Sequence, residues 1–176
     1  MYLIGDIGNT ETKICLFNNK RKLLKKKIFD TSNFEKINLS DRFKFLNSYR
    51  KKIDKTIFSS VVPNVYKNVK GSIKKKLRVE VKELKQFNLK KILKIEVNTK
   101  QVGSDRLANA ISVINNKDNF IILDFGTATT FDVVIKNNYR GGVIAPGLKI
   151  SLNTLSHKAT LIPKINLKKI KKTIGV

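Results

Sequence analysis

The chain has 176 residues, 41% of them hydrophobic, which is enough to bury a core in one domain or in two small lobes. Its apolar residues fall in short periodic segments, and Asp6 interrupts the apolar start, so we expect neither a membrane-spanning helix nor a signal peptide. The net charge of +24 resides on lysines scattered over amphipathic segments without interleaved aromatic residues, a pattern that favours solvated faces over a specific nucleic-acid site.

The first half of the chain alternates predicted strands and helices. Strands are predicted where apolar residues alternate, at 2–5, 14–17, 25–31 and 56–63. Helices are predicted at 38–52, with Phe43, Leu46 and Tyr49 on one face, and at 64–77. This order indicates an α/β fold with a mixed sheet covered by helices.

The second half repeats the alternation. After a strand end and loop at 95–103, a helix is predicted at 104–116 with Ser104 as its N-cap. Strands are then predicted at 120–124, 131–135 and 139–147, followed by a helix at 150–162 that turns Leu152 and Leu155 toward the core. A boundary near residues 95–100 divides the chain into predicted lobes 1–97 and 98–176.

One pattern occurs twice in the chain, as YLIGDIGNTETKICL at residues 2–16 and FIILDFGTATTFDVV at residues 120–134. Each copy is an apolar run followed by Asp-x-Gly, a Thr-rich turn and an alternating strand. The matched pairs are Asp6 with Asp124, Gly8 with Gly126, and Thr12 with Thr130.

Such a turn suits a metal-bound phosphate. Glycine lets backbone N–H groups approach phosphate oxygens, and the Asp can hold Mg²⁺ directly or through water. A single copy is weak evidence, because Asp-Gly turns are common in hairpins without a ligand. Two copies favour a clamp in which both hairpins bind one nucleotide.

The duplication resembles the actin and sugar-kinase superfamily, whose two lobes each open with an Asp-x-Gly phosphate hairpin. Within it, five motifs occur in the order typical of the type III pantothenate kinase family: DIGNTETK at 6–13, SSVVP at 59–63, GSDR at 103–106, DFGTATT at 124–130 and GGVIAPG at 141–147. The resemblance implies a duplicated, two-lobed actin-like and ribonuclease H-like fold with mixed sheets flanked by helices. It also implies ATP-dependent phosphorylation of pantothenate to 4′-phosphopantothenate, the entry to coenzyme A.

The family motifs assign roles to residues of this chain. The ATP phosphate loop would comprise Asp6, Ile7, Gly8, Asn9, Thr10, Glu11, Thr12 and Lys13. Asp6 would be the Mg²⁺ partner, Thr127 would meet ATP from the second lobe, and Asp124 would hold a monovalent cation, K⁺ or NH₄⁺, near a homodimer interface.

The GSDR motif would bind and activate the substrate. Gly103, Ser104, Asp105 and Arg106 would contact pantothenate, with Arg106 suited to its carboxylate because a guanidinium binds such a group bidentately. Asp105 would take the proton from the substrate hydroxyl. On spacing alone, an acidic residue in the first turn of a helix is explained by the helix dipole, and only the resemblance favours catalysis.

The chain departs from the family pattern in two places. Glu96 occupies the position of an aromatic residue that contacts pantothenate, and a carboxylate facing the pocket would repel the substrate's own. The chain also ends at Val176, before a substrate-contacting Thr and the helices that complete the second lobe, so we expect that lobe to be incomplete.

Two alternatives remain open. One is a nucleotide-binding paralogue or fragment with impaired catalysis and a regulatory or accessory role. The other is nucleic-acid binding driven by the positive charge, which would weaken steeply as salt rises. Whichever function holds, the single cysteine, Cys15, cannot pair within the chain, which predicts a reducing, cytoplasmic location.

Overall fold

In the computed structural model, the described residues are 1–36, 39, 41–159 and 162. The chain forms two compact units: residues 1–122 together with 132–141, and residues 123–131 together with 142–176. Within the described ranges, no helix is long and apolar enough to cross a bilayer.

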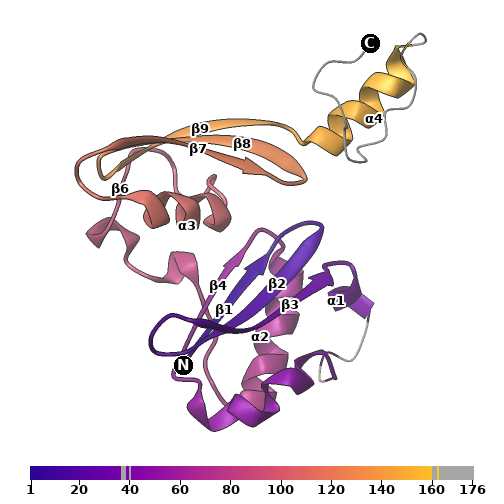
Figure 1. Ribbon diagram of the computed structural model, residues 1–176, viewed down its shortest axis with the longest axis vertical. Coiled ribbons are helices and arrows are strands. Elements are labelled where there is room, and N and C mark those ends of the chain that lie inside the picture. Colours follow the sequence, from indigo (N-terminus) through magenta and orange to yellow (C-terminus); the bar gives the residue numbers. More distant parts are fainter. Residues whose placement is uncertain (37–38, 40, 160–161, 163–176) are drawn as a thin grey trace. The chain divides into compact units, whose positions relative to one another are not determined.

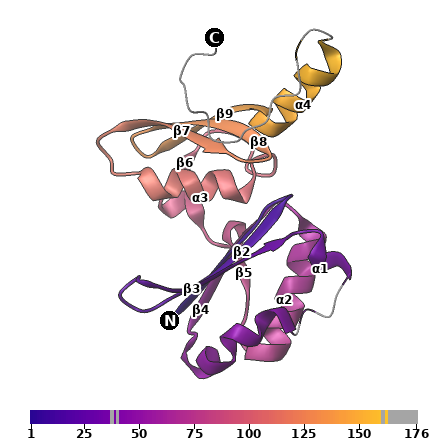
Figure 2. The ribbon, with the colours of Figure 1, turned by 45° about the vertical axis from the view of Figure 1, so that its right-hand side comes forward.

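The first unit opens with a five-stranded mixed sheet of order β3-β2-β1-β4-β5 (Figures 1 and 2). Strand β1 pairs antiparallel with β2 and parallel with β4. The bounds are β1 Tyr2–Ile7, β2 Glu11–Phe17, β3 Leu23–Asp30, β4 Lys55–Ser60 and β5 Lys82–Glu83. The four predicted strands are confirmed: β1, β2 and β3 are longer than predicted, whereas β4 ends at Ser60 and is shorter than the predicted 56–63. Strand β5 was not predicted.

Helices cover one face of this sheet, because alternate strand residues turn inward. Leu3, Ile14 and Phe58 are fully buried on that face and belong to one core with side chains of the covering elements. Those elements are α1 Asn33–Lys36, the 3-10 helix η1 Asp41–Lys52 and α2 Pro63–Leu77. The opposite face carries Asp6 and Lys13, which sit in register on β1 and β2.

The predicted helix at 38–52 is a 3-10 helix over its described part, Asp41–Lys52, while residues 37–38 and 40 lie outside the described residues. Phe43, Leu46 and Tyr49 are three positions apart, and this spacing aligns them in a helix of three residues per turn. Phe43 and Leu46 are fully buried, and Tyr49 packs partly against the same core. Burying that stripe explains the tighter helix.

A second sheet follows, of order β6-β9-β8-β7. Two-residue connections join β7 to β8 and β8 to β9, as in antiparallel hairpins, and β6 pairs parallel with β9. The bounds are β6 Lys94–Ile95, β7 Asn119–Phe125, β8 Ala128–Ile135 and β9 Asn138–Pro146, after the short 3-10 helices η2 Leu84–Gln86 and η3 Leu89–Lys91. The two mixed sheets flanked by helices confirm the predicted fold class.

Helix α3, Ser104–Val113, lies along one face of this sheet (Figures 1 and 2). Leu107 and Ala110 of the helix share a buried cluster with Val134 of β8 and Tyr139 of β9. This small core fixes the start of α3 relative to β8 and β9, and therefore positions the GSDR motif.

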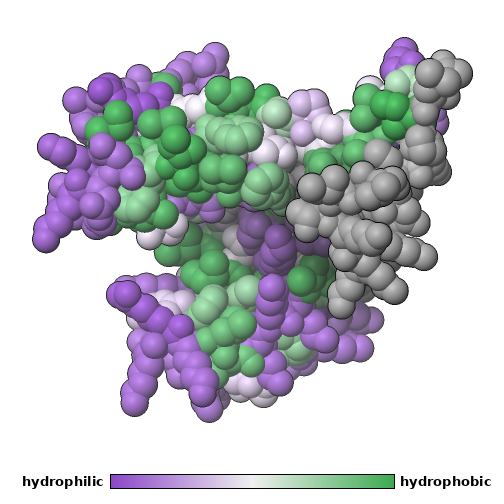
Figure 3. All heavy atoms as spheres, turned by 45° about the horizontal axis from the view of Figure 1, so that its top comes forward, coloured by the Kyte–Doolittle hydropathy of each residue, from purple (hydrophilic) through white to green (hydrophobic). Residues whose placement is uncertain are grey.

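The second unit contains the β7–β8 turn and helix α4, Leu148–Lys158. No residue of α4 is buried, and Leu155 is 44% exposed, so the prediction that Leu155 faces a core is wrong for the described chain. Other apolar side chains of this unit, among them Phe125 and Val143, are also exposed, and Figure 3 shows apolar surface beside polar surface on one face of the molecule.

Candidate functional site

The first Asp-x-Gly hairpin places Asp6 near the end of β1, in register between Lys13 of β2 and Ser59 of β4. The Ser59 hydroxyl donates a hydrogen bond of 3.2 Å to Asp6 Oδ1. A carboxylate at the end of a sheet strand, with a lysine and a hydroxyl beside it, can hold a hydrated cation and its phosphate. The predicted residues 6–13 therefore lie together at one end of β1 and β2.

The turn of this hairpin is held by a residue that the sequence did not single out. Thr31 is 3% exposed, and its hydroxyl donates to the carbonyl of Gly8 at 2.7 Å while its backbone N–H donates to the carbonyl of Thr10 at 2.8 Å. Because the single Thr31 hydroxyl proton is used in this way, Thr12 is the donor in the 3.0 Å contact between the two hydroxyls. Thr31 thus fixes the shape of the loop.

The GSDR motif forms the N-terminus of α3, and Gly103, not Ser104, occupies the N-cap position. The predicted N-cap role of Ser104 is therefore wrong. Its hydroxyl, in a residue 1% exposed, accepts a hydrogen bond of 2.8 Å from the Ser60 N–H and donates one of 3.0 Å to the Ser60 carbonyl. The Ser104 hydroxyl is therefore hydrogen-bonded to the backbone of β4 instead of to the backbone of α3, as an N-cap hydroxyl would be.

Asp105 lies in the first turn of α3, where the helix dipole favours a negative charge. Its Oδ1 accepts a hydrogen bond of 2.8 Å from the Arg106 N–H. The same oxygen would lie 2.2 Å from a β-carbon added to Gly103, so the carboxylate folds over this glycine. Position 103 thus accommodates the carboxylate because it has no side chain.

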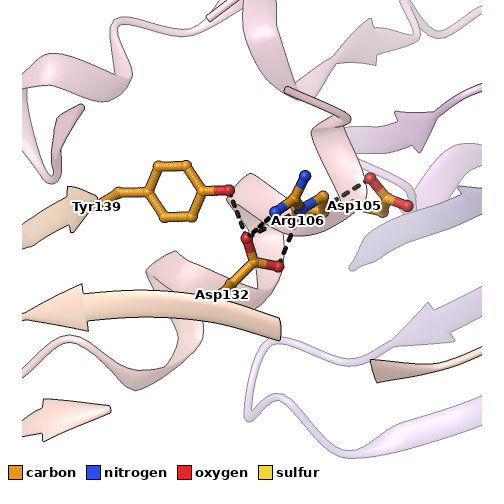
Figure 4. A network of polar contacts seen from close by, with 4 residues as sticks. All are labelled: Asp105, Arg106, Asp132 and Tyr139. Carbon is orange, nitrogen blue, oxygen red and sulfur yellow. Dashed lines mark hydrogen bonds and ion pairs between the residues drawn. The ribbon is translucent and has the colours of Figure 1, made fainter. Parts of the chain in front are cut away.

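Arg106 is 8% exposed and is already paired within the protein (Figure 4). Its Nε donates to Asp132 Oδ1 and Oδ2 at 2.9 and 3.1 Å, and its Nη2 lies 2.7 Å from Oδ1. Tyr139 donates to Asp132 Oδ1 at 2.5 Å. The hydrogen bond to Asp132 raises the pKa of Arg106, and burial together with the bond to Asp132 raises the pKa of Tyr139.

Strand β4 connects two of the predicted motifs. Its residues Ser59 and Ser60 are consecutive, and the first contacts Asp6 while the second contacts Ser104. The phosphate hairpin and the GSDR motif are therefore joined through the end of one strand. Ser59 and Ser60 are the first two residues of the SSVVP motif, so the structural role of this motif is to join the phosphate hairpin to the GSDR motif.

The second hairpin belongs to the other unit. Asp124 is exposed near the end of β7, and Thr127 lies in the two-residue turn between β7 and β8. The N–H of Gly147 donates to the Thr127 carbonyl at 3.1 Å, and a β-carbon at Gly147 would lie 2.4 Å from the carbonyl oxygens of Gly126 and Thr127. That both hairpins bind one nucleotide stays a prediction.

Glu96 does not carry an unbalanced charge. Its carboxylate accepts a hydrogen bond from Arg140, and Lys94 Nζ lies 3.4 Å from its other oxygen. The hydrogen bond from Arg140 is the main cause that lowers the pKa of Glu96. Two cations beside this carboxylate reduce the repulsion that the sequence predicted for an anionic substrate.

Asp132 and Tyr139 are the polar residues of this region that sequence reasoning missed. Asp132 stands between apolar residues of the predicted strand FDVVI, at the position that alternates with Thr130 and Val134. An acidic residue on the inward face of a strand needs a buried partner, so this position was a usable signal. The sequence did not indicate that Arg106 is this partner, because the two residues lie 26 positions apart with no pattern linking them.

Metal binding at these sites would depend on single carboxylates. In the described part of the chain, no three His, Cys, Asp or Glu side chains are grouped so that they could hold a metal ion. Mg²⁺ in phosphate-transfer sites commonly takes one or two carboxylates and completes its shell with water and phosphate oxygens. The carboxylate of Asp6 fits that requirement, and the exposed carboxylate of Asp124 offers an oxygen ligand for a monovalent cation.

Comparison with known sequences gives one family. The sequence profile described as type III pantothenate kinase matches residues 2–176. A type III pantothenate kinase from Pelagibacter ubique (strain HTCC1062) is 58% identical over 176 residues, covering all of this chain and 71% of that protein. One from Sulfurihydrogenibium sp. (strain YO3AOP1) is 39% identical, covering 99% of this chain and 72% of that protein.

Solved structures agree with the fold. A protein from Campylobacter jejuni, described as a conserved Baf family transcriptional activator, has a TM-score of 0.56 at 18% identity over 97% of this chain and 68% of its own. A Sinorhizobium meliloti protein described as a 2-dehydro-3-deoxygalactonokinase has a TM-score of 0.52 at 8% identity, over 90% of this chain and 58% of its own. At these identities the likeness concerns the fold alone.

Proposed function

Since this chain belongs to the type III pantothenate kinase family, we propose that it transfers the γ-phosphoryl group of ATP to pantothenate and forms 4′-phosphopantothenate, the first step of coenzyme A synthesis. The observation that carries the proposal is the 58% identity to a type III pantothenate kinase over the entire chain. The connection of the Asp6 hairpin to the GSDR motif through Ser59 and Ser60 supports it, because a kinase needs its phosphate loop and its substrate site together.

The first hairpin is proposed to bind the phosphates of ATP through residues 6–13. Its backbone N–H groups and the Lys13 ammonium would contact phosphate oxygens, and the hydrogen bonds of Thr31 would keep the loop in one shape. Mg²⁺ held by Asp6 would neutralise charge that develops on the transferring phosphoryl group. Ser59 would orient the Asp6 carboxylate toward that ion.

Asp105 is proposed as the general base. As the 4′ oxygen of pantothenate bonds to the γ-phosphorus and the bond from that phosphorus to the leaving ADP oxygen breaks, the Asp105 carboxylate would accept the hydroxyl proton. Its support is the position over Gly103, in the first turn of α3. Gly103, Ser104 and Arg106 would position the substrate, with the guanidinium of Arg106 directed at its carboxylate.

The second hairpin is proposed to complete the nucleotide site. Thr127 would contact ATP, and Asp124 would hold K⁺ or NH₄⁺ next to an interface between two copies of the chain. Exposed apolar side chains such as Phe125 and Val143 support association, since large apolar patches on a surface usually mark an interface. The division into lobes 1–97 and 98–176 and a cytoplasmic location also belong to the proposal.

The test is turnover of the chain with ATP, Mg²⁺, K⁺ and pantothenate, followed as ADP release and as 4′-phosphopantothenate by mass spectrometry. Asp105→Asn should lower kcat by roughly 10²–10⁴-fold, the usual contribution of a general base. Asp41→Asn is the matched control, because Asp41 is an exposed aspartate in η1 that forms a surface ion pair with Lys44, and it should keep full activity.

Calorimetry distinguishes the remaining outcomes. Binding of ATP without binding of pantothenate, and without turnover, would favour the catalytically impaired nucleotide-binding relative, and absence of ATP binding would eliminate it. A folded chain that binds neither ligand would reject the proposed function.

A further inference from the structure

Asp132 is a buried carboxylate that the proposed reaction does not use directly. It lies on β8 with 0% exposure, and its contacts are Arg106 of α3 and Tyr139 of β9 (Figure 4). Asp132 therefore joins three separate elements at one point next to the GSDR motif.

Burying this carboxylate requires compensation, because an isolated charge in a protein interior is strongly destabilised. Arg106 supplies the opposite charge through Nε and Nη2, and the Tyr139 hydroxyl supplies a neutral donor. A buried ion pair is by itself weak evidence for a role in stability, since apolar residues of similar volume often stabilise as well. The cost of the arrangement points to a reason other than stability.

The geometry around Arg106 suggests that reason. Asp132 engages only one edge of the planar guanidinium, the edge formed by Nε and Nη2. Nη2 lies at ion-pair distance but makes no hydrogen bond to any described residue, although it is buried. The outer edge, formed by Nη1 and the second N–H of Nη2, is not used by Asp132 and has the spacing that binds a carboxylate bidentately.

Holding Arg106 also affects its neighbour. Asp105 and Arg106 are consecutive in the first turn of α3, and the Arg106 N–H donates to the Asp105 carboxylate. A guanidinium fixed by Asp132 therefore limits movement of the turn that presents Asp105. Tyr139 limits rotation of Asp132 in the same way, because its hydroxyl holds one carboxylate oxygen.

We propose that Asp132 and Tyr139 are positioning residues for substrate recognition: they hold the Arg106 guanidinium by one edge so that its other edge binds the carboxylate of pantothenate. The inference rests on the proposed function and adds to it the residues that hold Arg106 in place. Neither residue touches the reacting atoms, and both act through Arg106.

The test compares pantothenate with its alcohol analogue pantothenol, which has a hydroxyl group in place of the carboxylate. Binding of each is measured by calorimetry, and turnover of each with ATP, in the unsubstituted chain, Tyr139→Phe and Asp132→Asn. Tyr139→Phe keeps the ring that fills the core and removes only the hydroxyl. Tyr66→Phe is the matched control, because its hydroxyl donates to the backbone carbonyl of Val81 in the other core.

We expect Tyr139→Phe to weaken pantothenate binding by roughly ten-fold, the usual effect of losing a hydrogen bond to a charged group, while binding of pantothenol and of ATP changes less than about two-fold. Asp132→Asn should reduce the preference for pantothenate over pantothenol further. Tyr66→Phe should leave the preference unchanged.

The outcomes separate the two proposals. If Tyr139→Phe weakened the binding of pantothenate and of pantothenol equally, the hydrogen-bond network would only stabilise the fold. That result would overturn the inference and leave the proposed function intact. The same conclusion follows if both ligands bind Tyr139→Phe as they bind the unsubstituted chain. Failure of the unsubstituted, folded chain to bind pantothenate at all would reject the proposed function and the inference with it.

Discussion

The hydroxyl of Ser104 bonds both backbone polar groups of Ser60, at 2.8 Å to its nitrogen and 3.0 Å to its oxygen. Ser60 is the last residue of β4, and Ser104 is the first of α3. A strand in the first sheet thereby holds the start of the helix that carries Asp105. The contact joins β4 to α3, whose Leu107 and Ala110 pack in a different buried cluster from Phe58 of β4, so a change there should affect both stability and catalysis.

Ser104→Ala should destabilise the chain by about 1–2 kcal/mol, because it removes the hydroxyl that bonds the N–H and carbonyl of the partly buried Ser60. The free energy of unfolding in urea measures the effect. Ser112→Ala is the control within α3, since Ser112 is exposed and its hydroxyl donates to the carbonyl of Asn109 in its own helix. Similar losses in the two variants would contradict a special role for the Ser104 contact.

Gly103→Ala should lower kcat by roughly 10- to 100-fold with little change in the unfolding free energy. A β-carbon there would lie 2.2 Å from Asp105 Oδ1, so the carboxylate must move, and misplacing a catalytic group by about 1 Å can cost about 10²-fold in rate. Steady-state kinetics provide the measurement. Gly71→Ala in α2 has no atom within 4 Å of the added carbon, and it should retain kcat.

Thr31→Val should weaken ATP binding by roughly 2- to 10-fold, because it removes the hydrogen bond to the Gly8 carbonyl and the contact with Thr12. Pantothenate binding should be unaffected, and calorimetry with each ligand tests both statements. Thr56→Val removes a comparable hydroxyl bond, to the Glu80 carbonyl at 2.5 Å, from the same sheet. If Thr56→Val weakened ATP binding equally, the effect would be one of general stability.

Tyr139→Phe should make stability less sensitive to alkaline pH. The unfolded phenol has a pKa of about 10, and burial with the bond to Asp132 raises the pKa in the folded state. Above pH 10 the unfolded chain therefore loses a proton that the folded chain keeps, so stability falls as pH rises, by up to about 1.4 kcal/mol per pH unit.

Urea unfolding at pH 8, 9, 10 and 11 tests this sign. The stability difference between the unsubstituted chain and Tyr139→Phe should be constant below pH 9 and shrink above pH 10. Parallel curves over the whole range would mean that Tyr139 ionises alike in both states.

The regular elements were predictable from the sequence where apolar alternation was strong. Strands β1 and β2 bury every second residue, and α2 buries Val65, Val69, Ile73 and Leu77 at helical spacing. The helix at 41–52 was predicted in the right place but with the wrong geometry, because a three-residue apolar spacing fits both helix types. Strand β5 has two residues, too few for any period to appear.

The motifs of the candidate site were also visible in the sequence, whereas their supports were not. Asp105 and Arg106 are adjacent in the chain, but Asp132 is 26 positions further on and Tyr139 comes from another strand. Pairing across elements depends on how α3 lies over β8 and β9, which local patterns do not encode. The sequence predicts Ser104 as an N-cap because a serine before an apolar helical segment suits that position. Its hydrogen bonds to Ser60 depend on the end of β4 lying beside α3, which the sequence pattern does not show.

The packing of Gly147 against the β7–β8 turn has a consequence for engineering. Backbone oxygens of Gly126 and Thr127 occupy the space where a side chain at 147 would be, and backbone cannot rotate away as a side chain can. A peptide tag or fluorophore-accepting loop inserted at 126–127 would push that turn into Gly147. The β2–β3 connection, where Asn19 and Lys20 are exposed to solvent, offers the room that such an insertion needs.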